Sequence, residues 1–500
     1  MKWHPTLARL CTAVNTVVLL VFAFVGGLFP FGFVVYHLSD SALREPGMPR
    51  AAVWMHQRLS PKHDAWARAR MASDRPGQLT TADLAGTEWP LFGSVFYLWT
   101  TEALQQAHKA EDAAVPVPSS VYAAEAIESA TTLVLDPGHA EWVRRHWGNS
   151  YLDQQNAFYR MLILSAATSH RELTGETTYA ALLEYQSWAL VQELSAAPFG
   201  LIEDYPGECY PGDVMAVVAA VSRSGQPVPG GADGFRARAL RAFESPALDP
   251  LNLPPYQVAS RTGQPIGPSR GCSNSYLVFL AADVYPALAV QWYDLYEEHF
   301  WQQRAGVAGF REYPRSMPEH DWELGDLDAG PIIGGFGMAA SAFGVAAARS
   351  VGRYDHAYPL AAQMLAASWP LPDGTLLLPR ILSNSIDAPH LGEACILYNL
   401  TRQPAEGMPI TTGGRIPLLV YAILAAYLLG AMVLMLAAWQ RAWPVLRSSQ
   451  PRIPFVWVQA PVWAALFAGG VVLFVLGHHA AGLMVLVLSQ LFPRIRTQAA

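Results

Sequence analysis

The chain has 500 residues, of which 52% are hydrophobic and 15% are charged. It is too apolar for an ordinary soluble enzyme of this size and too charged for a pure transporter, so we expect a globular domain joined to a few membrane spans. The formal net charge is -7, and no basic stripe interleaved with aromatic residues is present, which argues against nucleic acid as a partner.

The N-terminal apolar run covers residues 10–38, and its uninterrupted part ends at Phe29. That part has about the twenty residues that a membrane-spanning helix needs, whereas the core of a cleaved signal peptide is shorter. Residues 1–38 are therefore predicted to form a retained signal anchor, in which Pro30 ends or kinks the helix near the far interface.

Two further apolar blocks lie near the C-terminus. Residues 414–440 are predicted to form one transmembrane helix, and residues 455–493 are long enough for a transmembrane hairpin. The loop 441–454 and the tail 494–500 contain arginines, and short basic loops prefer the cytoplasm. We therefore expect a multi-pass protein of the cytoplasmic (inner) membrane, with its large domain on the extracytoplasmic side.

Residues 39–86 are interpreted as a linker and entry segment and residues 87–413 as the large domain. This domain contains about a dozen segments with helical periodicity, each roughly 10 to 20 residues long and separated by short loops rich in Pro, Gly and Asp. No run of alternating β-branched residues and no alternation of strands with helices is visible, so the predicted fold class is all-α.

A single domain with so many helices is usually a stacked solenoid or a closed double ring. No fixed-period self-similarity is visible, which argues against a solenoid. We therefore expect an (α/α)6 barrel, a toroid whose inner helices are rich in small and apolar residues, as the stretch from Phe336 to Val351 is. In such a barrel the functional site lies where the inner helices begin.

The stretch 309–352 concentrates the residues that a catalytic or binding site needs. It opens with Arg311 and Glu312, passes a carboxylate-rich loop that contains Trp322, and enters the small-residue helix near Phe336. Carboxylates interleaved with apolar side chains and followed by such a helix suggest the mouth of a pocket.

Asp326 and Asp328 are the carboxylates closest to this helix. If both are desolvated, their pKa values separate, which leaves one as an acid and the other as a base. Asp328 precedes Pro331 by three residues, so capping of the next helix is an equally good interpretation of it.

Glu88 is nearly alone in the apolar stretch EWPLFGSVFYLW, which also contains Trp89 and Tyr97. It is either a favourable charge at a helix N-terminus or a pocket carboxylate. Further along the chain, Gln154 and Asn156 enter an otherwise apolar helix, where such side chains more often satisfy buried backbone groups than bind a substrate.

Cys209 and Tyr210 lie in the acidic loop EDYPGECYPGD. Neighbouring carboxylates disfavour a thiolate, so proton shuttling is a better role for Cys209 than nucleophilic attack. At most one disulfide can form among the cysteines of the domain, which are Cys209, Cys272 and Cys395.

The segment PSRGCSNSY places Arg270, Asn274 and Tyr276 at another helix start. No GxSxG elbow surrounds a serine there, and no Cys/His triad spacing is recognisable, which argues against a serine hydrolase. No metal-ligand spacing is present either, so we predict neither a metal nor another cofactor.

The segments 326–330 (DLDAG), 337–343 (GMAASAF) and 348–352 (ARSVG) resemble the late acidic loop and following helix of the linalool dehydratase/isomerase family. Weaker similarity extends over most of the region from Glu88 to Leu400. Members of that family are (α/α)6 barrels that act on terpene alcohols outside the cytoplasm, and the resemblance implies this fold and substrate class here.

The chain departs from the family at two places. Gln154 stands where the family has a histidine, just before the position of Asn156, and only Cys209 remains of the family's pair of cysteines. The resemblance therefore does not carry the family's acid/base chemistry over to this chain.

The first hypothesis is a membrane-anchored enzyme that dehydrates or isomerises an isoprenoid-like alcohol by acid/base chemistry, without a cofactor. A protonated carboxyl would protonate the leaving hydroxyl, and Cys209 or Tyr210 would take a proton from the neighbouring carbon. The predicted catalytic residues are Glu88, Asp326, Asp328, Cys209 and Tyr210. The predicted substrate-binding residues are Trp89, Tyr97, Gln154, Asn156, Arg270, Asn274, Tyr276, Arg311, Glu312, Trp322 and Phe336.

Two alternatives remain open. One is a glycosidase-like enzyme in which paired carboxylates flank a glycosidic bond and Trp89 and Trp322 act as sugar platforms. The other is a non-enzymatic, membrane-anchored binding module whose acidic loop is only a solvated rim. Convergence of the carboxylates at one place would separate the two enzymes from the binding module. The sequence predicts no oligomeric state.

Overall fold

The computed structural model describes residues 5–244, 248–326, 329–447 and 459–475, together with the single residues 482, 485, 486 and 489. The predicted catalytic residue Asp328, the tail 494–500 and part of the expected hairpin 455–493 lie outside the described residues.

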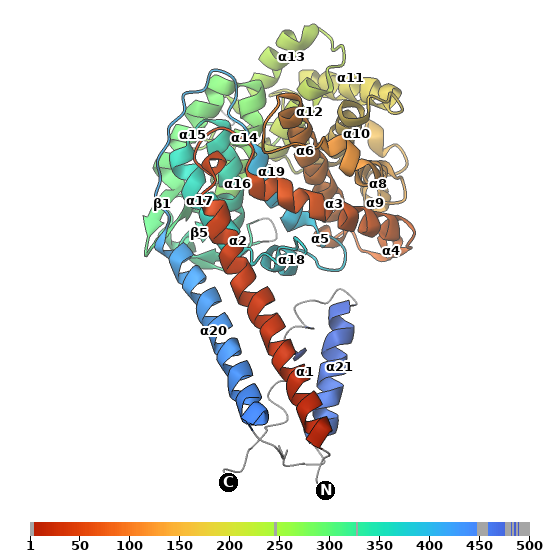
Figure 1. The fold of residues 1–500 in the computed structure, drawn as a ribbon. Coiled ribbons are helices and arrows are strands. Elements are labelled where there is room, and N and C mark those ends of the chain that lie inside the picture. The colour runs from red at the N-terminus through yellow and green to blue at the C-terminus, as the bar shows by residue number, and fades with distance from the viewer. Residues whose placement is uncertain are drawn as a thin grey trace.

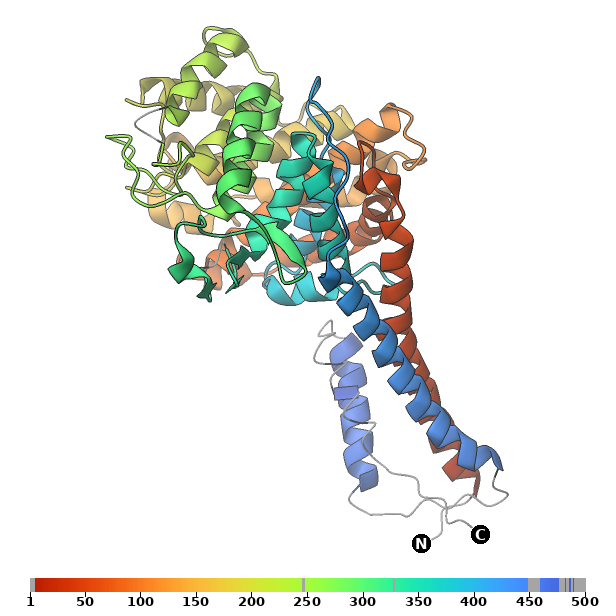
Figure 2. The ribbon, with the colours of Figure 1, turned by 90° about the vertical axis from the view of Figure 1, so that its left-hand side faces the viewer.

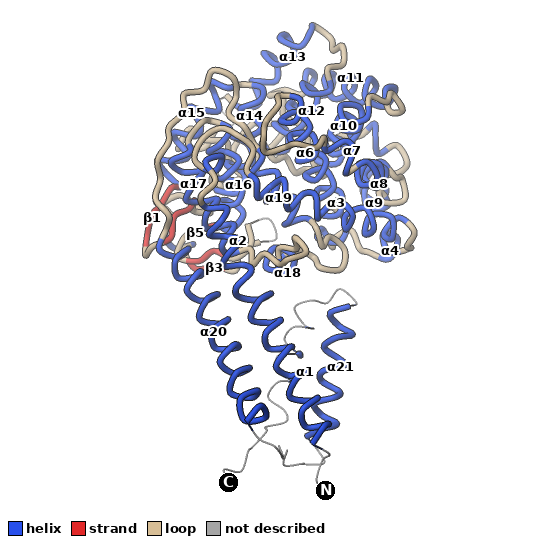
Figure 3. The backbone as a smooth tube through the Cα atoms, in the orientation of Figure 1, coloured by secondary structure: helices blue, strands red, loops and turns tan. Residues whose placement is uncertain are grey.

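The chain is mostly helical, as predicted, and the strands among the described residues are short (Figure 3). In one antiparallel pair, β1 (Trp301–Arg304) lies beside β2 (Val307–Phe310). In a second small sheet, β4 (Ile332–Ile333) lies between β3 (Trp322–Glu323) and β5 (Phe336–Gly337). The sequence analysis predicted no strands here, because such short segments cannot display a period-two pattern.

Six helices contact one another in a closed circle, in the order α6, α10, α12, α14, α16, α19 and back to α6. We call these helices the ring. Their bounds are α6 (Trp89–Lys109), α10 (Ala157–Thr174), α12 (Pro211–Ser224), α14 (Gly271–Val284), α16 (Met338–Ser350) and α19 (Leu391–Thr401). Small residues allow close contacts between them: a Cβ added to Gly93 of α6 would lie 3.1 Å from the Cα of Leu391 in α19.

A second set of helices packs against the ring. These are α3 (Arg50–Met71), α8 (Ala124–Leu135), α11 (Ala180–Ala196), α13 (Gly231–Ala239), α15 (Pro286–Phe300) and α17 (Tyr354–Ala367). The segment 39–86, interpreted as a linker, thus contains α3, a helix of 22 residues that packs against α6, α8 and α19.

Short helices complete the domain. They are α4 (Arg75–Gln78), α5 (Leu84–Thr87), α7 (Ser119–Tyr122), α9 (Glu141–Trp147) and α18 (Leu377–Leu382). The 3-10 turns are η2 (Ser41–Leu43), η3 (Tyr151–Asp153), η4 (Leu240–Phe243) and η5 (Pro318–His320).

One long helix enters the domain from below in Figure 1 and consists of α1 (Pro5–Ala23), η1 (Phe24–Leu28) and α2 (Phe29–Leu38). η1 is a π-helical turn, in which the backbone N–H of Phe29 donates to the carbonyl of Phe24. Pro30 has no N–H to donate and its ring crowds the preceding turn, and the π turn accommodates this disruption. The helix therefore continues past Pro30. Of the two predicted outcomes, an end or a kink of the helix at this residue, the first is wrong.

Among the described residues, two helical stretches are long and apolar enough to cross a membrane, Thr12–Leu38 and Leu418–Trp443. The second lies in α20 (Leu418–Arg447), which packs along α1 and η1 (Figures 1 and 2). A Cβ added to Gly27 would lie 2.7 Å from the Cβ of Ala431, so Gly27 allows the two helices to approach closely. We call α1, η1, α2 and α20 the stalk. α21 (Gln459–Val475) lies on the same side of the domain.

Candidate functional site

The segments that precede the ring helices gather at one end of the ring, which we call the mouth. The Tyr205 hydroxyl donates to Glu88 at the start of α6, and the backbone N–H of Phe158 in the first turn of α10 donates to Asp204 at 2.8 Å. The short elements α5, β5 and α18, which precede α6, α16 and α19, all lie on the face of the domain from which the stalk leaves (Figure 1).

Aromatic side chains from different ring helices meet inside the ring beside the mouth. The ring of Phe92 in α6 lies 5.2 Å from that of Phe158 in α10 and 6.1 Å from that of Tyr276 in α14. Tyr276 in turn lies 5.8 Å from Phe343 in α16. These side chains therefore face inward and form an apolar lining whose π faces can also stabilise a positive charge.

The hydroxyl of Tyr276 is buried and has no hydrogen-bond partner among the described residues. Burial, with smaller contributions from Asp213 and Asp204, holds the pKa of Tyr276 well above its usual range, so the hydroxyl keeps its proton. A Cβ added to Gly212 would lie 3.5 Å from the Tyr276 ring, which shows how closely the start of α12 packs on it. Because a buried hydroxyl without a partner is costly, this group is suited to bind a polar atom of a ligand.

Cys209 and Tyr210 lie just before α12. Cys209 is fully buried, and burial followed by the charges of Asp204 and Asp213 holds the pKa of its thiol far above the usual range. The Tyr210 hydroxyl donates to Glu208 at 2.6 Å, and burial and this carboxylate raise the pKa of Tyr210 as well. Neither side chain is therefore a good proton acceptor near neutral pH.

An ionic cluster, buried at Arg270 and Glu312 and half-exposed at Asp326, joins the starts of α14 and α16. The Nε of Arg270 donates to Glu312 at 2.9 Å, and its Nη atoms donate to both carboxylate oxygens of Asp326. The thiol of Cys272 donates to Glu312 at 3.0 Å, and the guanidinium of Arg270 lies 4.4 Å from the Tyr256 ring centre. The single guanidinium of Arg270 thus forms ion pairs with two carboxylates.

Glu312 is fully buried. Burial raises the pKa of its carboxyl from the ordinary value of 4.5 to about 7, although Arg270 and Cys272 act in the opposite direction, and Asp326 adds a further increase. A carboxyl with such a pKa exchanges its proton near neutral pH, which is the property expected of a general acid or base. The carboxyl also accepts from the backbone N–H of Cys272 at 3.3 Å, so it helps to cap α14.

Several predicted site residues lie elsewhere. Tyr97 is buried outside the ring lining, where its hydroxyl donates to Ser60 at 2.8 Å and its ring stacks on His63 at 4.4 Å. Arg311 pairs with Asp321 rather than with the Arg270 cluster. Trp322, on β3, is 77% exposed.

The remaining predicted residues stay near the helix starts. Trp89 and Phe336 are half-buried, at the beginning of α6 and in β5. The side chains of Asn156 and Asn274 are buried and donate to backbone carbonyls, but the Oδ1 atom of each has no partner within the described part of the chain. Gln154 is exposed.

Sequence reasoning missed Tyr205 and Cys272. Both stand in segments that it had singled out, but their partners Glu88 and Glu312 are distant along the chain, so no spacing pattern could pair them. Within the described part of the chain, Cys209, Cys272 and Cys395 do not form the disulfide that the sequence allowed.

Across the described residues, no group of three or more His, Cys, Asp or Glu is arranged to hold a metal ion. No protein-family model matches the chain, and no curated protein matches its sequence. The function must therefore be argued from the mouth and the aromatic lining themselves.

Proposed function

We propose that the protein is a membrane-anchored enzyme that removes water from an apolar, isoprenoid-like alcohol, or isomerises it, by acid/base chemistry inside an (α/α)6 barrel. The closed circle of ring helices and the second set packed against it support the barrel. The observation that carries the proposed chemistry is the buried Tyr276 hydroxyl without a partner among the described residues, located between an aromatic lining and the acidic mouth.

In the proposed reaction, Tyr276 donates a hydrogen bond to the substrate hydroxyl and thereby fixes the substrate in the ring. Glu88, one helical turn before Phe92 on α6, supplies the proton to that hydroxyl, and the C–O bond breaks as water leaves with the bonding electron pair. The faces of Phe92 and Phe343 stabilise the resulting carbocation.

Asp213 then takes a proton from the carbon next to the cation, and the electrons of that C–H bond form the new double bond. We assign this step to Asp213 because it contributes to the pKa of the Tyr276 hydroxyl and lies in the first turn of α12. Cys209 and Tyr210 were the predicted acceptors, but their raised pKa values make them poor bases, and we assign them to the wall of the site. Water returned to the cation at another carbon would give the isomerised alcohol.

We further propose that the domain lies on the extracytoplasmic side of the membrane. The end of α20 away from the domain carries Arg441 and Arg447, and short basic segments favour the cytoplasm. This is the orientation predicted from the same arginines in the sequence analysis.

The test uses the full chain in lipid nanodiscs, incubated with a panel of tertiary and primary isoprenoid alcohols and, in parallel, with oligosaccharides. We expect an alkene or an isomerised alcohol by gas chromatography and mass spectrometry, and its loss in Glu88→Gln and Asp213→Asn. Cleavage of an oligosaccharide would replace the proposal with the glycosidase alternative, and no turnover of either panel would favour a binding module.

A further inference from the structure

We propose that the mouth-bearing face of the domain rests on the bilayer that the stalk enters, with a rim of exposed apolar side chains inserted into the lipid surface. The binding partner of this face is thus the membrane itself. The proposal concerns a surface and its partner, and it stands whether or not the reaction proposed above is correct.

The rim consists of large apolar side chains that are between 38% and 89% exposed. Its members are Trp322, Leu324, Ile333, Met338, Trp369, Leu378, Ile381, Leu382 and Ile386. Isolated exposed apolar residues are ordinary, but a cluster of large ones on one face marks an interaction surface.

The rim lies on the stalk side of the domain and borders the mouth. α18, with Leu378, Ile381 and Leu382, lies on the lower face of the domain in Figures 1 and 3, from which α2 and α20 emerge. β3, with Trp322, lies on that same face in Figure 3. Figure 2, turned by 90°, shows α18 on that same face. Since β5 leads into α16 and α18 precedes α19, the rim lies beside the ends at which these ring helices begin.

The position of α20 in the membrane indicates how deeply this face of the domain lies in the bilayer. Trp439 and Trp443 stack at 4.6 Å near the far end of the candidate span and are typical of a membrane interface. The span Leu418–Trp443 has 26 residues. At ~1.5 Å per residue it is about 39 Å long, some 9 Å more than a ~30 Å hydrocarbon core. The first turns of α20 therefore lie at the interface on the domain side.

The domain touches α20 below those first turns. The hydroxyl of Tyr427, nine residues after Leu418, donates to the carbonyl of Ala366 at 2.7 Å, and its ring lies 5.7 Å from that of the rim residue Trp369. At ~1.5 Å per residue, this contact lies about 14 Å along the helix, about 5 Å inside the hydrocarbon boundary. This contact therefore places the rim residue Trp369 at the depth of the lipid hydrocarbon.

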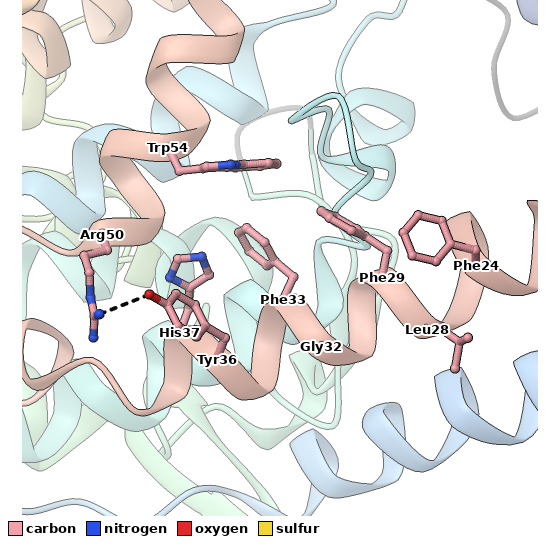
Figure 4. A pocket seen from close by; sticks show the side chains of 9 residues that line it. All are labelled: Phe24, Leu28, Phe29, Gly32, Phe33, Tyr36, His37, Arg50 and Trp54. Carbon is pink, nitrogen blue, oxygen red and sulfur yellow. Dashed lines mark hydrogen bonds between the residues drawn. The ribbon is translucent and has the colours of Figure 1, made fainter.

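A groove beside the other stalk helix also points to a position at the membrane interface. It has a volume of about 510 Å³ and lies between η1–α2 and α3, with Phe29, Phe33 and Trp54 in its wall (Figure 4). At its end toward the domain, Arg50 donates to the Tyr36 hydroxyl at 3.1 Å. Aromatic side chains with a guanidinium beside them are favoured at the lipid headgroups, so this end of α2 is also at the interface.

The charges near the rim indicate how it binds. Glu319 and Glu323 lie on the outer part of the loop between β2 and β4, and His320 bonds to Glu323 at 2.7 Å. Arg380, the cation on α18, pairs with the buried carboxylate of Glu393 at 3.9 Å, and acidic side chains give no attraction to anionic lipid headgroups, so we expect contact to come from the apolar side chains. We therefore expect binding to zwitterionic lipid that is insensitive to salt.

The test places the photo-crosslinker p-benzoylphenylalanine at Leu324 or Ile386 in the full chain, held in phosphatidylcholine nanodiscs. Two other exposed apolar positions, Val121 on α7 (67% exposed) and Trp188 on α11 (51% exposed), serve as controls because their helices lie away from the stalk (Figure 3). After irradiation, mass spectrometry measures lipid adducts at each position.

We expect at least tenfold more lipid adduct at Leu324 and Ile386 than at either control, unchanged in 1 M salt. Equal yields at all four positions would overturn the proposal. A tenfold loss of adduct at high salt would also overturn it, because apolar insertion is not screened by ions. The crosslinker replaces exposed side chains only, and circular dichroism of each variant verifies that the fold is kept.

Discussion

Two buried arginine clusters near the starts of ring helices divide their charges in opposite ways. Ahead of α19, the carboxylate of Asp387 lies between two guanidiniums, those of Arg70 at 3.0 Å and Arg75 at 2.8 Å. Ahead of α14, the single guanidinium of Arg270 lies between Glu312 and Asp326. Counted by ion pairs, the first cluster has two guanidiniums for one carboxylate, and the second has one guanidinium for two carboxylates.

The pKa values of Asp387 and Glu312 differ in the direction expected from the charges around them. Burial alone would raise the pKa of Asp387, but the hydrogen bonds and charges of Arg75 and Arg70 outweigh it and hold this pKa below its usual value. In the other cluster burial prevails, and the pKa of Glu312 reaches about 7. The comparison teaches that burial and the neighbouring cations together decide whether a carboxyl is a fixed anion or a proton-exchanging group.

The largest expected effect is that of Arg270→Met. Because it leaves Glu312 buried without its cation, it should lower the free energy of unfolding by about 3–5 kcal/mol. Arg70→Met is the matched control, and we expect a smaller loss because Asp387 keeps the two hydrogen bonds of Arg75. Denaturant unfolding of both variants in detergent measures the difference. An equal or larger loss in Arg70→Met would contradict the comparison.

The next effect is a pH dependence carried by Glu312. Folded Glu312 has a pKa of about 7 against an ordinary 4.5, so between these values the folded state holds a proton that the unfolded state has lost. Stability from this group is therefore fully present below pH 4.5 and is lost as the pH rises toward 7.

Glu312→Gln removes this titration. The stability of the wild-type protein relative to Glu312→Gln should fall by up to about 3 kcal/mol between pH 5 and pH 8. Thermal unfolding of both proteins over this range measures the change. A constant difference, or one that grows with pH, would mean that the Glu312 carboxyl is ionised throughout.

Tyr276→Phe should affect activity and leave stability nearly unchanged. The hydroxyl has no partner among the described residues, so its loss should shift the free energy of unfolding by less than about 0.5 kcal/mol while kcat/KM falls about 10- to 100-fold. Tyr97→Phe is the matched control, because this hydroxyl is equally buried but donates to Ser60 outside the ring lining. It should cost about 1 kcal/mol of stability and leave kcat/KM within about twofold. The reverse pattern would remove Tyr276 from the substrate site.

The smallest expected effect is that of Arg75→Met. The side chain of Arg75 is 40% exposed, so its ion pair with Asp387 is screened by solvent and its loss should cost less than about 1 kcal/mol. Asp387 should stay ionised beside Arg70. A loss of stability as large as that of Arg270→Met would show that Asp387 needs the ion pairs of both Arg70 and Arg75.

The helical class and the stalk could be read from local patterns. Apolar runs of the required length predicted the two candidate spans, and the small-residue stretch predicted α16 to within two residues at its start. The interpretation of residues 39–86 as a linker overlooked α3, because a polar face and Pro61 inside the helix obscure its periodicity.

The candidate site was predictable only in part. The sequence drew attention to Arg270, Glu312 and Asp326 as separate candidates, and the structure joins them in one cluster. It also grouped Arg311, Trp322 and Tyr97 with them, although these side chains lie elsewhere. Proximity along the chain says little about which way a side chain points once loops and hairpins fold back.

By itself, therefore, the sequence determined the helical class, the apolar spans and the types of residue at the helix starts, because these depend on periodicity and composition within about twenty residues. Only the tertiary structure decided that Arg270 serves two carboxylates and that the Tyr276 hydroxyl is left without a partner among the described residues. Burial and the number of neighbouring charges are set by segments far apart in the chain, and these two quantities fix the pKa and hydrogen bonding of each group.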